Sequence, residues 1–224
     1  MGVVGVVGVV VVPLFVIASG VAWTAVPRSL REACDQARVS LDDVMAALLG
    51  MPARSQPDHS WDVAPIAALV RYIVDTHHEY TRRALADIPP LLDKVVRRHA
   101  GSHRELLEIS ALYQALAAEL APHVMKEEQV LFPYALQLAA GQPAAACFST
   151  VRAPISVMHR EHDSAGTLLR HLREVSRGYA PPDDACTSYR ALLTALADLE
   201  RDLHEHIHLE NNVLFPRLVR LEAS

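Results

Sequence analysis

The chain has 224 residues and a mass of 24.6 kDa, enough for one mid-sized domain and a smaller one. Its net charge of −5 at pH 7 and pI of about 6.2 exclude the basic surface that nucleic-acid-binding proteins use. Hydrophobic residues make up 51% of the chain and aromatic residues only 5%, and Ala and Leu are abundant, so an all-α fold is favoured over a β-sheet protein.

The first segment, residues 1–28, is apolar, rich in Gly and Val, and uncharged before Arg28. Its length allows a membrane span or a signal peptide. However, it lacks a positively charged start, and neither a membrane span nor a signal peptide is typically made of repeated Val and Gly with a proline such as Pro13. A misassigned start or a shifted reading frame fits better, because Gly20 to Pro27 read two bases over can encode a Cys-Cys pair. We therefore expect no membrane anchor.

Residues 29–50 are predicted to form two short helices, with Ser29 and Ser40 as their N-caps. Residues 51–60 are rich in Pro, Ser and charge and are predicted to form a linker. The three cysteines of the chain are scattered and form no C-x-x-C. This argues against a zinc ribbon or a disulfide framework and fits the reducing cytoplasm.

Residues 61–221 show the apolar stripes of four long helices. Their connections are short, which predicts an up-down four-helix bundle. We expect Pro89-Pro90 to bend or end the first helix, and Pro122 and Pro133 to kink the second. The four helices are predicted to start near Pro65, Ser102, Pro154 and Thr187.

One stretch of sequence occurs twice in these helices. His123–Pro133 and His206–Pro216 share the pattern H-x-x-x-E-x-x-V-L-F-P, which indicates a duplicated structural unit. Residues four apart lie on one face of a helix. Each copy therefore presents an imidazole beside a carboxylate, and this pair is typical of a metal site.

A second pair of histidines extends the duplication. His78 lies 45 positions before His123, and His162 lies 44 positions before His206. Two helical hairpins of one design, each with two His and one Glu, explain this spacing. Helical phase leaves open whether His77 or His78 belongs to the set.

The His and Glu residues of the duplication replace apolar residues in the stripes that should form the core. A buried carboxylate without a partner is strongly destabilising, so these groups need one another or a metal. Two carboxylates and four imidazoles suit a pair of irons better than one tetrahedral zinc. A zinc site is satisfied by fewer ligands in a tetrahedron, so we expect no zinc protease or other hydrolase.

Residues Trp61 to Leu221 resemble the hemerythrin-like (HHE) domain, and resemble still more the di-iron proteins called Repair of Iron Centers, which repair iron–sulfur clusters. The resemblance is carried by both copies of the repeat and by five further strings: Ala64-Pro65-Ile66-Ala67, Thr76-His77-His78-Glu79, Pro154-Ile155-Ser156-Val157-Met158, Glu161-His162-Asp163-Ser164-Ala165-Gly166, and Pro181-Pro182 with Ala185-Cys186-Thr187.

The resemblance implies two Fe ions in a μ-oxo- and carboxylate-bridged centre, and it selects His78 over His77. Its metal positions fall on His78, His123, His162 and His206, with Glu127 and Glu210 bridging the irons. It also implies that Glu119 and Glu161 line a polar route to the metals. The residues alone would make Glu119 a partner of His123 and Glu161 a surface carboxylate.

The family also has a small N-terminal domain with a Cys-Cys pair, and residues 29–50 match only its end. Trp23-Thr24-Ala25 stands near the place of that pair. We therefore interpret residues 29–50 as the remnant of a small helical domain, and any role of the thiols is in doubt for this chain.

The function implied by the resemblance is the repair of iron–sulfur clusters damaged by nitrosative or oxidative stress. The centre would donate iron or process NO, and whether it reduces NO as an enzyme stays open. The expected partners are damaged iron–sulfur proteins, with NO or O₂ as small ligands. We expect a cytoplasmic monomer or weak dimer.

The alternative is a hemerythrin-like module that binds, stores or senses dioxygen or iron. Reversible O₂ carriers of that type have five His around the metal pair, whereas the duplication here supplies four. Four would leave a position open on each iron, which favours exchange chemistry. His77 acting as a fifth ligand would weaken this argument.

Overall fold

In the computed structural model, the described residues are 31, 34–35, 38–49, 61–142 and 148–223, and their regular secondary structure is helical. The chain divides into two compact units, Met1–His59 and Ser60–Ser224. No helix in the described ranges is both long and apolar enough to cross a membrane. The segment 1–28, for which we considered a membrane span, and the linker expected at 51–60 lie outside these ranges.

The first unit contains helix α3 (Leu41–Leu49). The Ser40 hydroxyl accepts a hydrogen bond from the backbone N–H of Asp43 at 3.3 Å, and Asp42 and Asp43 lie in the first turn, where carboxylates favour the helix N-terminus. Val44 is buried. The predicted helix opened by Ser40 is thus confirmed.

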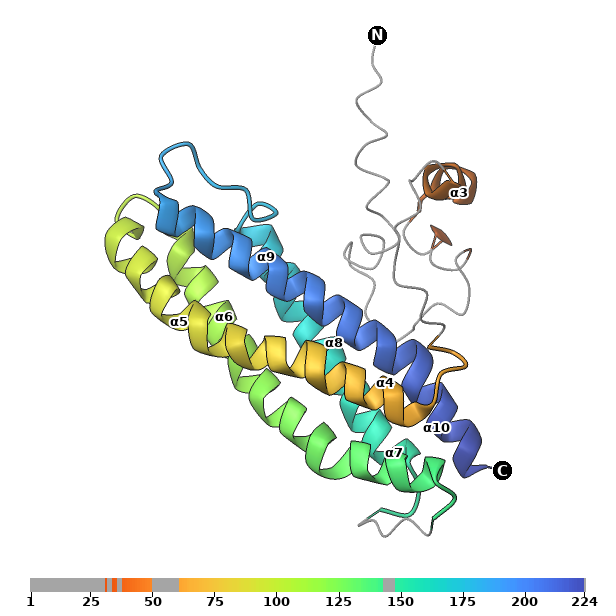
Figure 1. The fold of residues 1–224 in the computed structure, drawn as a ribbon. Helices are drawn as coiled ribbons and strands as arrows, with labels where there is room; N and C mark the ends of the chain where they lie inside the picture. Colours follow the sequence, from red (N-terminus) through yellow and green to blue (C-terminus); the bar gives the residue numbers. More distant parts are fainter. Residues whose placement is uncertain (1–30, 32–33, 36–37, 50–60, 143–147, 224) are drawn as a thin grey trace. The chain divides into compact units, whose positions relative to one another are not determined.

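The second unit is built from four helical rods (Figure 1). Rod α5 packs against α6 and α9, and α6 also packs against α8, so the predicted four-helix bundle is confirmed. The rods are, in chain order, α4 (Ile66–Tyr72), η1 (Ile73–His78) and α5 (Glu79–His99); α6 (Glu105–Lys126), η2 (Glu127–Leu131) and α7 (Phe132–Ala139); α8 (Arg152–Val175); and α9 (Thr187–His208), η3 (Leu209–Leu214) and α10 (Phe215–Glu222).

Among the described residues, three of the four rods contain a π-helical segment, η1, η2 or η3, at the level of the His and Glu residues of the repeat. Such turns are rare and gather at functional sites. A π turn takes up one residue more than an α turn, so it does not continue a 3.6-residue stripe. Val130, seven residues after His123 and so on the same α-helical stripe, is 40% exposed, whereas the next residue, Leu131, is 1% exposed.

The tandem prolines do not end the first rod. Helix α5 continues through Pro89 and Pro90 to His99, so of the two predicted effects, a bend or an end, the end is wrong. Both prolines are exposed. On that face, water can hydrate the carbonyl groups that the missing N–H donors leave without a helical partner.

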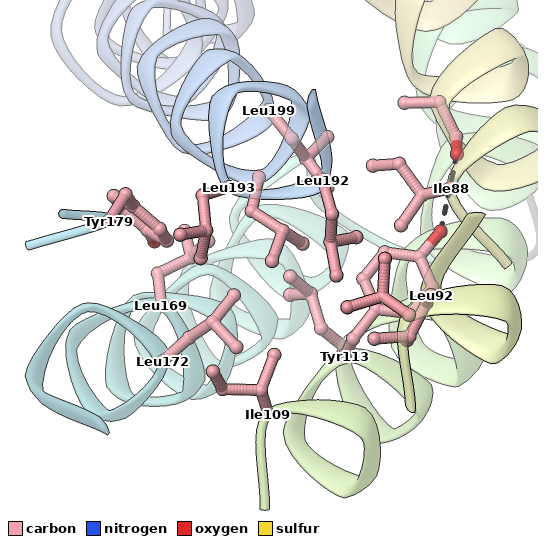
Figure 2. Packing of buried hydrophobic residues seen from close by; sticks show 14 of the residues in the cluster. Ile88, Leu92, Ile109, Tyr113, Leu169, Leu172, Tyr179, Leu192, Leu193 and Leu199 are labelled. Carbon is pink, nitrogen blue, oxygen red and sulfur yellow. Dashed lines mark hydrogen bonds between the residues drawn. The ribbon is translucent and has the colours of Figure 1, made fainter. Parts of the chain in front are cut away.

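The bundle buries two hydrophobic clusters. The larger one is made by α5, α6, α8 and α9, whose side chains point toward one another in Figure 2, and the Tyr113 hydroxyl within it donates to the carbonyl of Ala84 at 3.2 Å. The smaller one is made by α4, α7, α10 and the π-helical segments with the start of α8. Along every rod the predicted metal-binding residues lie between the two clusters.

The larger cluster makes a stability prediction. Leu192 is fully buried in α9, so Leu192→Ala should lower the free energy of unfolding by about 2–5 kcal/mol through lost burial and a residual cavity. Leu107→Ala is the control, because Leu107 is 56% exposed. Guanidinium denaturation measures both, and equal losses would contradict this packing.

A second prediction concerns the division of the chain. Both hydrophobic clusters lie within Ser60–Ser224, so a chain beginning at Ser60 should keep a cooperative thermal transition and the helical circular-dichroism signal. A broad, non-cooperative melt of that shortened chain would show that the first unit is required for folding.

Candidate metal centre

The six residues predicted as metal ligands come together in the middle of the bundle, and each is at most 4% exposed. Each rod contributes at least one of them. His78 ends η1, His123 lies in the last turn of α6, Glu127 begins η2, His162 lies in α8, His206 lies in the last turn of α9, and Glu210 lies in η3.

The donor atoms form two groups. Position 1 is made by His78 and His206, and position 2 by His123 and His162, and both groups include Glu127 and Glu210. Within each group the donor atoms lie within 4.8 Å of one another. The duplication of the sequence therefore becomes two adjacent groups of donor atoms, each able to hold a cation, that share both carboxylates.

Each carboxylate directs one oxygen toward each position. Glu127 Oε2 lies 3.3 Å from His78 Nε2 and Glu127 Oε1 lies 3.2 Å from His123 Nε2. Glu210 Oε1 lies 3.3 Å from His206 Nε2 and Glu210 Oε2 lies 3.2 Å from His162 Nε2. A carboxylate with its two oxygens directed to different positions is arranged as a bridging ligand.

The donor set fits bound cations. The paired Nε2 atoms lie 3.3 Å apart in position 1 and 3.2 Å apart in position 2. Two ring nitrogens that bind one first-row ion at about 2.1 Å lie roughly 3 Å from each other. All four oxygens of Glu127 and Glu210 are buried and make no hydrogen bond within the described ranges, so a cation would satisfy charges that the protein leaves unsolvated.

Three of the four imidazoles are anchored through Nδ1. His78 donates to Glu128 at 2.7 Å, His123 to Glu161 at 2.9 Å, and His162 to the side-chain oxygen of Asn211 at 2.9 Å. These bonds select the tautomer with a free Nε2 and hold that atom toward the centre. The two carboxylates are neutralised in turn, Glu128 by Arg82 and Glu161 by Lys126.

The structure corrects the residue-based interpretation of Glu119 and Glu161. As the alternative to the polar route, the residues alone made Glu119 the partner of His123 and Glu161 a surface carboxylate. Glu161 is the partner of His123, and Glu119 instead accepts a hydrogen bond from the Ser164 hydroxyl at 3.0 Å. Glu119, four positions before His123 on the same helix, is therefore not its partner, because Nδ1 of His123 is bonded to Glu161 of the neighbouring helix α8.

His77 belongs to neither group of donor atoms. Its side chain is buried, and its Nδ1 lies 3.0 Å from Asp202 Oδ1. The structure therefore brings His78 and not His77 to the other donor atoms.

The Phe of the repeat has a local role. The ring of Phe132 is stacked on His78, with centroids 5.5 Å apart, and the ring of Phe215 is stacked on His162 at 6.1 Å. In each hairpin the repeated Phe thus packs on the first His of the same hairpin. Both Phe side chains are buried, so they restrict these rings and exclude water on one side.

The charged groups of the centre shift the pKa values of its own His and Glu residues when no metal is bound. Burial lowers the pKa of His123, but the carboxylates of Glu127, Glu210 and Glu161 raise it by more, to about 9. Burial likewise lowers the pKa of His206, and Glu210 and Glu127 reverse this and raise it. Burial raises the pKa of Glu210, whereas His206 and His162 bring it well below its usual range.

Comparison with known proteins agrees with this geometry. A family model, the Hemerythrin HHE cation binding domain, matches residues 69–218. The iron-sulfur cluster repair protein YtfE of Pectobacterium carotovorum subsp. carotovorum (strain PC1) is 36% identical over 199 residues, covering 87% of this chain and 85% of that protein. The YtfE proteins of Musicola paradisiaca (strain Ech703) and Yersinia pseudotuberculosis serotype IB (strain PB1/+) are 35% and 33% identical, over 88% and 87% of this chain and 85% of each relative.

The pKa shifts predict how the metal-free protein depends on pH. A His whose pKa is raised on folding stabilises the fold below its unfolded value of 6.5, and this stabilisation is lost as pH rises through about 9. Glu210, with a lowered pKa, stabilises the fold above its unfolded value of 4.5 and ceases to do so at lower pH.

The melting temperature of the metal-free protein should therefore be highest between about pH 4.5 and 6.5 and should fall toward pH 9. The metal-loaded protein is the control. Its melting temperature should not fall over the same range, because protons compete with the metal only on the acid side. Calorimetry at constant ionic strength measures both, and a metal-free protein that gains stability from pH 6.5 to 9 would contradict the shifts.

Proposed function

Because the chain belongs to the family of hemerythrin HHE cation-binding domains, we propose that its buried centre holds two irons joined by an oxo group and by the carboxylates of Glu127 and Glu210. His78 and His206 would hold one iron, and His123 and His162 the other. The observation that supports this most directly is the pair of shared carboxylates, each with one oxygen toward each position. A tetrahedral zinc site has no need of such sharing.

We propose further that the protein repairs iron–sulfur clusters damaged by nitrosative or oxidative stress. The relatives that cover most of the chain are named for iron–sulfur cluster repair. An iron pair bound at this centre would supply exchangeable iron and coordination positions for NO. The macromolecular partners would be damaged iron–sulfur proteins, and the site of action the cytoplasm, with the chain as a monomer or weak dimer.

The residues around the centre would bind and orient the metals. Glu128, Glu161 and Asn211 hold three rings with Nε2 inward, and the apolar clusters on both sides keep bulk water out. Glu161 is partly exposed and bonded to Lys126, so it connects His123 to the surface. This supports a polar route that passes Glu161. Glu119 accepts a hydrogen bond from Ser164 of α8, the helix that also contains Glu161.

The second candidate is reversible dioxygen binding or iron storage. Each position has two imidazoles and two carboxylate oxygens, which leaves room at both irons for exogenous ligands. His77 is engaged with Asp202, which disfavours the five-His arrangement of the O₂ carriers. Oxygen titration of the reduced protein distinguishes the two functions, because reversible uptake without repair of damaged clusters would support the second.

The bridging assignment predicts nearly interchangeable effects at the two Glu residues. A lost bridge affects both irons, whereas a lost imidazole affects one. Glu127→Ala and Glu210→Ala should each lose magnetic coupling and most of the iron, while His162→Ala should retain about one iron per chain. Iron analysis, oxo-to-iron absorption and magnetic susceptibility provide the measurement. Glu108→Ala is the control, because that side chain is 53% exposed.

Repair should follow the coupled centre. The variants are incubated with an iron–sulfur protein whose cluster has been damaged by NO, and recovery of its activity is measured. We expect the two bridge variants to lose repair and the Glu108 control to keep it. If one bridge variant retains two coupled irons, the shared-bridge assignment is wrong. If repair survives in a variant without coupled iron, the chemistry lies elsewhere in the chain.

A further inference from the structure

The two hairpins match at the inner donors and differ in the residues just outside them. In the register of the repeat, Glu161 of the second hairpin corresponds to His77 of the first, and Lys126 corresponds to Leu209. Glu161 and Lys126 both lie beside His123 of position 2, and the equivalent places in the repeat hold His77 and Leu209. The two cation positions share their bridges but not their surroundings.

Position 2 has both of its imidazoles anchored. His123 is bonded to the Glu161 carboxylate and His162 to the Asn211 amide oxygen, each at 2.9 Å. Both rings are buried. A partner on Nδ1 fixes the ring and makes the opposite nitrogen a better donor to a metal, so position 2 has two supported ligands.

Position 1 has only one anchored imidazole. His78 is bonded to Glu128 at 2.7 Å, but Nδ1 of His206 is buried and has no hydrogen-bond partner in the described part of the chain. The residue that stands where Glu161 would support it is His77. The rings of His77 and His206 are stacked, with centroids 5.8 Å apart and planes 7° apart, and stacking supplies no acceptor for the N–H group.

His77 cannot turn to accept from His206 without losing its own partner. Its Nδ1 is engaged by Asp202 at 3.0 Å, and its Nε2 is buried without a hydrogen-bond partner among the described residues. Leu209, in the place of Lys126, brings no charge to this side. The orientation of His206 therefore depends on ring packing and on Glu210 rather than on a bond behind the ring.

The other supports of the two positions are closely matched. Each position has one imidazole bonded to a carboxylate, and each of those carboxylates is neutralised by a cationic side chain, Arg82 for Glu128 and Lys126 for Glu161. The bridges are shared. The remaining difference lies at Nδ1 of the other imidazole. In position 2, His162 is bonded there to Asn211, whereas in position 1, His206 has no hydrogen-bond partner there among the described residues.

We infer that position 1 is the exchangeable metal position, so that the metal held by His78 and His206 leaves first and the metal held by His123 and His162 stays. His77 is the positioning residue that sets this order. The inference rests on the proposed iron pair and specifies which iron the centre would hand over. Loss of an outer partner typically lowers metal affinity about 10–100-fold, so the two release rates should differ by about tenfold or more.

The test is position-resolved iron release from the whole protein. The two-iron protein is reduced and mixed with ferrozine, and release is followed by absorbance. Crystals of protein stopped at one iron per chain are then measured at the iron absorption edge. We expect two phases in solution, and the remaining anomalous peak beside His123 and His162.

The matched variants change the support behind one ring at a time. His77→Gln offers His206 an amide oxygen, as Asn211 does for His162, and should slow the fast phase about tenfold and merge the two phases. Asn211→Leu removes the support of His162 and should accelerate the slow phase instead. His208→Gln is the control, because His208 is exposed on the same helix and bonds to Asn212, and it should leave both rates unchanged.

The outcomes separate this inference from the proposed function. A protein that binds no pair of irons would refute the proposed function itself. A two-iron protein that releases both irons at one rate, or empties the His123–His162 position first, would overturn the order of release alone. If His77→Gln does not fold, the anomalous measurement on the unchanged protein still decides the order. If the His77→Gln variant folds and releases both irons at unaltered rates, His77 does not set the order of release.

Discussion

The structure depends on the burial of two carboxylates in the middle of an apolar bundle. Glu127 and Glu210 are fully buried between two hydrophobic clusters, and their oxygens make no hydrogen bonds in the described ranges. Such groups destabilise a fold unless opposite charge lies beside them. The four imidazoles surround them at 3.2–3.3 Å, so the metal-free bundle must hold protons where a metal-loaded one holds cations, and folding is coupled to metal binding.

That constraint explains why the duplication is strict at some residues and relaxed at others. The inner His and Glu and the stacked Phe recur in both hairpins because each acts on the shared carboxylates or on a ring that faces them. The next residues outward can vary, since they act on one ring only. Glu128 and Asn211 both accept from Nδ1 although one is charged and one is not. A duplicated site can thus keep common bridges while its two halves acquire different affinities.

Much of the centre could be predicted from sequence because its determinants are local. The spacing of His and Glu by four, repeated in two hairpins, places them on one face whatever the tertiary detail. The partner of His123 could not be predicted in this way, because Glu161 reaches it from another rod and no spacing encodes that contact. The continuity of α5 through Pro89 and Pro90 also depends on surroundings, namely the solvated helix face.

The π-helical segments link these observations. They occur in the three rods that contain His78, Glu127 and Glu210, and α8, which contributes His162, has none in its described length. Each π turn inserts an extra residue, and its last residue is buried in two rods, Leu131 after Glu127 and Leu214 after Glu210. Residues four apart share a face in an α-helix as well, so the π turn changes the helical phase of the residues beyond it rather than that of Leu131 or Leu214. The bundle thus combines a polar centre and a dry core along the same rods, with a local departure from α-helical geometry at the level of the candidate metal centre.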